Sequence, residues 1–213
     1  MISMMMRSRV MKALEAEEAV DRFELRVFDL ASLKQVAISA EDVAGLEDMG
    51  ERYVRETLRL LEACVTAADQ ARAPDIFPPV ISACERFFLQ HDPRIPDPNG
   101  LFGMICDSYL ARGLLAAVSQ QTMQIRGFPL LATNPHTEAP VIRRLIGAEI
   151  ADALDEIIED AFASPEVRFA ANGAYGLTGS LRATGSASDW EASWEEQMAS
   201  YGGSLGLALT NAA

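Results

Sequence analysis

The sequence predicts an all-α protein, a bundle of five or slightly more helices around one buried central helix, with a C-terminal arm. Long segments repeat apolar residues at steps of three and four, which is the period of an amphipathic helix. Proline and glycine are concentrated in the connections between these segments. A composition of 49% hydrophobic and 23% charged residues in a chain of 213 is typical of a soluble globular domain. We expect the bundle to occupy residues 1–165.

Two amphipathic regions come first, over residues 7–38 and 41–72. The first is expected to break near Ser32. Their apolar faces are formed by Val10, Leu14, Phe23, Val27 and Leu30 in the first region, and Val43, Leu46, Tyr53, Leu58, Leu61 and Val65 in the second.

A third helix is predicted to begin at Pro78 and Pro79, because proline is tolerated in a first turn, where its missing N–H donor would be unpaired anyway. This helix extends to about Gln90. Three further prolines in residues 91–100 exclude helix there and predict a stiff loop.

Residues 101–125 differ from the other segments because apolar side chains cover nearly the whole circumference of the predicted helix. Only Asp107 and Arg112 are charged there. A helix that is apolar all round is normally buried on all sides. We therefore place this helix at the centre of the bundle.

A fifth helix is expected over residues 138–163. Residues 170–186 are rich in small side chains and predict a loop, or at most a short hairpin. Ser188 with Glu191 forms a capping box that starts a short helix. Residues 166–213 are therefore interpreted as a flexible segment and a docking arm.

The net charge of −13 makes nucleic acid an unexpected ligand, because phosphates would be repelled. Residues 145–213 alone hold 11 acidic and 2 basic side chains. The acidity is thus concentrated in the last third of the chain, where it forms a directional surface suited to a basic or polar partner.

Three widely spaced cysteines, Cys64, Cys84 and Cys106, are expected to be reduced, buried thiols of a cytoplasmic protein. No signal peptide or membrane-spanning segment is expected. The two histidines, His91 and His136, flank opposite ends of the central helix, about 37 Å apart at 1.5 Å per residue, so a shared metal site is not expected. No cofactor is predicted.

Asp107, Tyr109 and Arg112 are the candidates for a ligand pocket, since a charge inside a buried helix needs a partner or a polar cavity. Two interpretations fit these residues. One is a satisfied buried ion pair, which is favoured, and the other is a binding cavity lined by all three side chains.

Four carboxylates, Glu149, Asp152, Glu156 and Asp160, recur at steps of three and four and line one face of the fifth helix. A solvated face is the favoured interpretation. No lysine or arginine follows at the i+4 positions, so a cationic partner would relieve the repulsion between like charges.

The arm carries an aromatic stripe, which we define as Trp190, Trp194, Met198 and Tyr201. Such side chains are expected to dock, either on the bundle of the same chain or on a partner, because tryptophan left in water forgoes about 2–3 kcal/mol of burial.

These features predict a non-enzymatic cytosolic protein that acts through protein contacts, as an adaptor, chaperone or assembly subunit. The partner is another protein or a second copy of the chain. The alternative is a small-molecule-binding protein or enzyme, with its pocket around Asp107, Tyr109 and Arg112.

Overall fold

The computed structural model describes residues 2–33, 35, 37–70, 77–90, 92–95, 99–127, 129–131 and 134–173. Within these ranges the chain forms eight helices and no strand, which confirms the all-α prediction. The helices are α1 (Met4–Glu15), α2 (Glu17–Leu33), α3 (Ala40–Gln70), α4 (Phe77–Leu89), α5 (Leu101–Arg126), α6 (Ala139–Ile146), α7 (Ala148–Ala163) and α8 (Pro165–Gly173).

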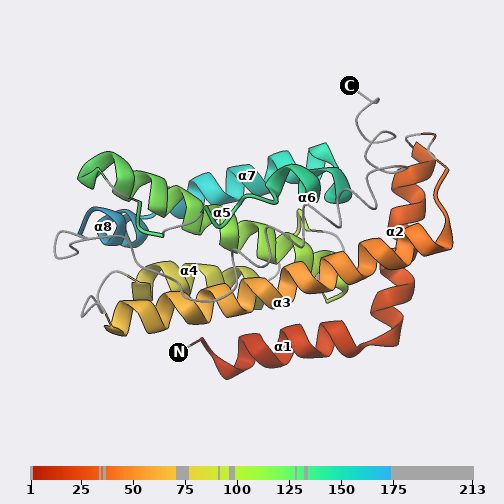
Figure 1. The fold of residues 1–213 in the computed structure, drawn as a ribbon, viewed down its shortest axis with the longest axis horizontal. Helices are drawn as coiled ribbons and strands as arrows, with labels where there is room; N and C mark the ends of the chain where they lie inside the picture. Colours follow the sequence, from red (N-terminus) through yellow and green to blue (C-terminus); the bar gives the residue numbers. More distant parts are fainter. Residues whose placement is uncertain are drawn as a thin grey trace.

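Helix α5 is the centre of the bundle, as its apolar circumference predicts. Figure 1 shows it between α3 and α7, and it also packs against α4, α8, α6, α1 and α2. Residues 101–115 are all buried, including the charged Asp107 and Arg112. Burial of this helix organises the bundle, because every other helix covers part of its surface.

The first predicted helical region is two helices. Ser3 caps α1 by accepting a hydrogen bond from the Met6 amide at 3.3 Å. Ala16 then takes an extended conformation, with φ −83° and ψ 113°, and ends α1. This break lets α2 cross one end of the bundle at a steep angle to α1 and α3 (Figure 1). The break near Ser32 is confirmed, since α2 ends at Leu33.

The fifth predicted helix is also divided, at Gly147. This residue has φ +92° and ψ 147°, a backbone conformation that is essentially restricted to glycine. Its amide donates to the Arg143 carbonyl at 3.0 Å and so closes the end of α6. The short helix α6 can therefore take its own direction before α7 begins.

Helix α8 extends the packed bundle past residue 165. Its apolar face buries Val167, Ala170 and Ala171 against α4, α5 and α7. The loop predicted from residue 170 onward is therefore wrong for residues 170–173, where alanine favours helix and the packing fixes it. Residues 174–213 lie outside the described part of the chain.

Two properties of the core concern its cysteines and the apolar character of α5. Cys64, Cys84 and Cys106 are free and buried, as predicted. Helix α5 is long and apolar enough to cross a bilayer, but 89% of its most apolar stretch is buried inside the bundle. This burial is compatible with a soluble protein, in which α5 is the core helix.

Gly147→Ala tests the break between α6 and α7. A Cβ here would meet only Leu30 Cδ2, at an ordinary 3.7 Å. The loss of stability is therefore expected from the backbone conformation alone and not from a side-chain clash. We expect the free energy of unfolding to fall by about 1–3 kcal/mol in urea denaturation followed by circular dichroism.

Gly127→Asn is the matched control. Gly127 lies in the left-handed region, with φ +79° and ψ 4°, and a Cβ there meets nothing within 4 Å. Asparagine tolerates that conformation, so we expect a loss of less than about 0.5 kcal/mol. Equal losses in the two variants would contradict the assignment of strain to Gly147.

Candidate functional site

Asp107 is buried in the core, 3% exposed, and no hydrogen bond joins its carboxyl to another described residue. Burial raises its pKa well above the ordinary value, while the charge of Arg9 in α1 acts in the opposite direction. Burial therefore favours the protonated form of this carboxyl, more than in an exposed aspartate.

Arg112, by contrast, is fully engaged by neighbouring helices. Its Nε donates to Thr57 Oγ1 at 2.7 Å, and its Nη1 donates to Glu138 Oε2 at 2.9 Å. Both charged side chains are 6% exposed. The guanidinium also lies over the Tyr53 ring, 4.4 Å from its centroid. The favoured prediction, an ion pair, thus describes Arg112, but its partner is Glu138 and not Asp107.

Tyr109 belongs to a second group of polar side chains on the same side of α5. Its hydroxyl donates to Asp155 Oδ1 at 2.8 Å and accepts from Arg143 Nη1 at 3.2 Å. Arg143 is also paired with both Asp152 and Asp155. Together these contacts tie α5 to α6 and α7.

His136 lies between the two groups. Its ring meets the ring of Tyr109 edge to face, with centroids 4.5 Å apart. Burial lowers the pKa of His136 to about 4, against the opposing effect of Asp155. The imidazole is therefore neutral at pH 7, and its Nδ1 is buried without a hydrogen-bond partner among the described residues.

The three predicted pocket residues do not lie on one face of α5. Tyr109 and Arg112 are three residues apart and face the same side of α5, whereas Asp107 is rotated away from both, because two residues correspond to about 200° of helix. The charged groups around Tyr109 and Arg112 pair with one another, while the Tyr53 hydroxyl and His136 Nδ1 beside them have no hydrogen-bond partner among the described residues. We conclude that they hold α6, α7 and the preceding loop against the core helix.

Sequence reasoning identified Tyr109 and Arg112 but missed Glu138, His136 and Arg143 as their partners. The buried charge of Arg112 signalled that an acidic partner was required. Nothing local marks Glu138 as that partner, since it is 26 residues away in the chain.

The acidic row on α7 receives cations from its own chain. Arg143 of α6 pairs with Asp152, and Arg94 of the loop before α5 approaches Glu156 with 4.0 Å between Nη1 and Oε2. Part of the repulsion expected along this face is therefore relieved without a partner. Glu149 and Asp160 are exposed at the two ends of the row.

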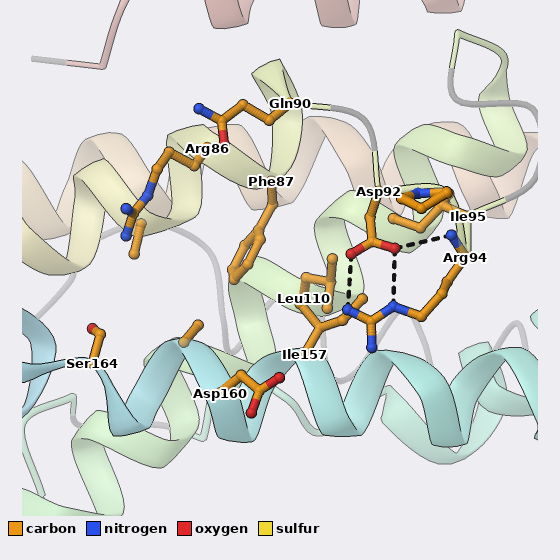
Figure 2. Close-up of a pocket in the computed structure, with 13 residues that line it drawn as sticks. Arg86, Phe87, Gln90, Asp92, Arg94, Ile95, Leu110, Ile157, Asp160 and Ser164 are labelled. Carbon is orange, nitrogen blue, oxygen red and sulfur yellow. Dashed lines mark hydrogen bonds and ion pairs between the residues drawn. The ribbon is translucent and has the colours of Figure 1, made fainter.

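A groove of about 430 Å³ lies between α4, the loop before α5, and α7. Figure 2 shows its lining. The apolar lining includes Phe87, Leu110, Ile157 and Ala161, of which Leu110 and Ile157 are buried in the core. A groove of this size with an apolar base and a few polar groups has the character of a small-ligand site.

The polar lining of the groove is unevenly distributed. Arg86 and Ser164 lie toward one end, while Arg94 and Asp160 lie toward the other (Figure 2). Arg94 is held by Asp92, with both Nε and Nη2 donating to that carboxylate at 2.9 Å. Arg86 forms no ion pair with any described residue, and the Ser164 hydroxyl lacks a described hydrogen-bond partner.

The outer face of α2 is the third candidate surface. Among the described residues, six of the nine large apolar side chains that are exposed belong to α1 and α2. On α2, Leu25 is 64% and Phe28 is 39% exposed. We define the α2 face as the exposed side chains of one arc of the helix, namely Arg22, Leu25, Phe28, Asp29, Ser32 and Leu33.

The aromatic stripe of the arm, Trp190, Trp194, Met198 and Tyr201, lies outside the described residues, as does His91. Within the described part of the chain, no group of three or more histidine, cysteine or acidic side chains is arranged to hold a metal ion.

Comparison of the chain with models of protein families, with curated proteins and with solved structures gives no match.

Glu138→Ala is expected to be strongly destabilising, because it removes the carboxylate that pairs with the buried guanidinium of Arg112 at 2.9 Å. We expect the free energy of unfolding to fall by about 3–5 kcal/mol in urea denaturation. Glu156→Ala is the control, since it removes one half of an exposed pair and should cost less than about 1 kcal/mol. A loss at Glu138 no larger than at Glu156 would refute the structural role of the buried pair.

Asp107→Asn is expected to change the pH dependence of stability. In the unfolded chain Asp107 ionises near pH 4, whereas the folded chain keeps the proton because its pKa is raised. Ionisation therefore favours the unfolded state above about pH 4, by at most about 1.4 kcal/mol per pH unit. The variant should gain stability over the natural chain as pH rises from 4 toward 8.

Thermal and urea unfolding across this pH range measures the effect, with Asp48→Asn at an exposed position of α3 as the control. A stability difference between Asp107→Asn and the natural chain that stays constant with pH would show that the buried carboxyl does not have a raised pKa.

Proposed function

We propose that this protein is non-enzymatic and works through protein contacts, with the α2 face as a surface on which a second copy of the chain docks. The observation that supports this proposal is the exposure of Leu25 and Phe28 next to each other on one helix. Large apolar side chains in neighbouring positions on a surface helix are typical of an interface.

Docking would bury these exposed side chains and so contribute a favourable hydrophobic free energy. Burying a leucine or phenylalanine side chain contributes about 1.5–3 kcal/mol. Helix α2 already uses Phe23 and Val27 to pack against the bundle, so its opposite side has no need of apolar residues for the fold. Leu25 and Phe28 therefore make no core contact that the fold requires, and in this proposal they contact a partner.

A second copy is the partner that we propose for the α2 face. Leu25, Phe28 and Leu33 are all exposed on this face. In an antiparallel pair of α2 helices, the apolar side chains of each copy lie against those of the other. A surface that pairs with itself in this way suits a twofold dimer.

The aromatic stripe of the arm belongs to the same proposal as a second contact. Its tryptophans and tyrosine are residue types that concentrate in protein interfaces. In this proposal the arm and the α2 face are separate surfaces, so removing one need not abolish the contact made by the other.

Light scattering at increasing protein concentration tests the dimer. We expect the mass to approach twice the 23.1 kDa of one chain, and Leu25→Glu with Phe28→Glu to return it to that of a single chain. The matched control is Met123→Glu with Phe169→Glu, which also places two acids on exposed apolar positions but on α5 and α8. This control should still dimerise.

A chain that stays monomeric at all concentrations contradicts self-association through α2. A dimer that survives the two glutamates but is lost on deleting residues 186–213 would assign the contact to the arm instead.

A further inference from the structure

We propose that the groove between α4 and α7 binds a small apolar molecule with a single carboxylate. The carboxylate pairs with Arg86, and the apolar body lies over Phe87, Leu110 and Ile157 (Figure 2). This site is separate from the α2 face and does not depend on self-association.

The dimensions and lining of the groove suit such a ligand. Its volume of about 430 Å³ is within the range that small-molecule sites occupy. Leu110 belongs to the central helix and is 1% exposed, so the groove reaches down to the core of the bundle. An apolar chain or ring placed there would cover mainly the half-buried Phe87, because Leu110 and Ile157 are already buried.

The polar groups that line the groove determine the sign of the ligand's charge. Arg86 comes from α4 and has no ion pair with a described residue, whereas Arg94 at the other end is held by Asp92. The side chain of Arg86 is exposed. A carboxylate at this end would gain the guanidinium as a partner, and charged hydrogen bonds are the stronger kind.

Asp160 limits the charge that the groove accepts. Its exposed carboxylate lines the opposite end, toward Arg94. A ligand with a second anionic group, or with a long acidic extension, would meet this carboxylate and be repelled. The groove therefore favours a monocarboxylate with an apolar remainder over a dianion.

Titration calorimetry with three probes that share a ten-carbon chain tests the proposal: decanoate, decanol and decyltrimethylammonium. The natural protein should bind decanoate at least about tenfold more tightly than the other two, because only decanoate pairs with Arg86. Arg86→Gln should reduce decanoate affinity by about tenfold and leave decanol unchanged. Arg59→Gln on the exposed surface of α3 is the matched control and should change neither.

Ala161→Leu tests whether decanoate binds in the groove, because the larger side chain fills the apolar part of the groove. It should weaken decanoate and decanol alike, with circular dichroism showing that the helices are retained. Equal affinity for decanoate and decanol, or no effect of Arg86→Gln, would overturn the carboxylate assignment. Absence of decanoate binding, or binding that Ala161→Leu leaves unchanged, would overturn the groove as the site.

Discussion

The burial of α5 is the constraint on which the rest of the structure depends. A helix of 26 residues that is apolar on all sides must be covered all round, and seven other helices contribute to that cover. The same burial means that any charge in α5 must be neutralised or paired. Arg112 is paired with Glu138, and the pKa of Asp107 is raised by its burial, which favours the protonated form. Two charged residues in one helix are thus accommodated by two different physical solutions.

The pairing of Arg112 also explains the course of the chain after α5. Glu138 directly precedes α6, so the ion pair fixes the start of that helix against the core. Gly147 then allows a sharp change of direction, and Arg143 and Asp155 join α6 and α7 to Tyr109. The polar groups first suspected of forming a pocket therefore serve to position α7. By doing so they set one wall of the groove that α4 completes.

Two features of the protein are not explained by the packing of its helices. Leu25 and Phe28 face outward on a helix whose other side already supplies its core contacts. Arg86 stands in a groove with an apolar base and without an internal counter-ion among the described residues. Neither feature improves the stability of a lone chain. We propose a second copy of the chain as the partner in the first case and an apolar carboxylate as the ligand in the second.

The sequence by itself determined the all-α class, the positions of α3, α4 and α5, and the burial of α5, because periodicity and proline placement act over a few residues. It did not show the breaks at Ala16 and Gly147, since alanine favours helix and the φ of a glycine leaves no sequence pattern. Only the tertiary structure decided that Arg112 meets Glu138 and that α4 and α7 enclose a groove. These contacts join segments far apart in the chain, and such pairings have no local periodicity from which to be predicted.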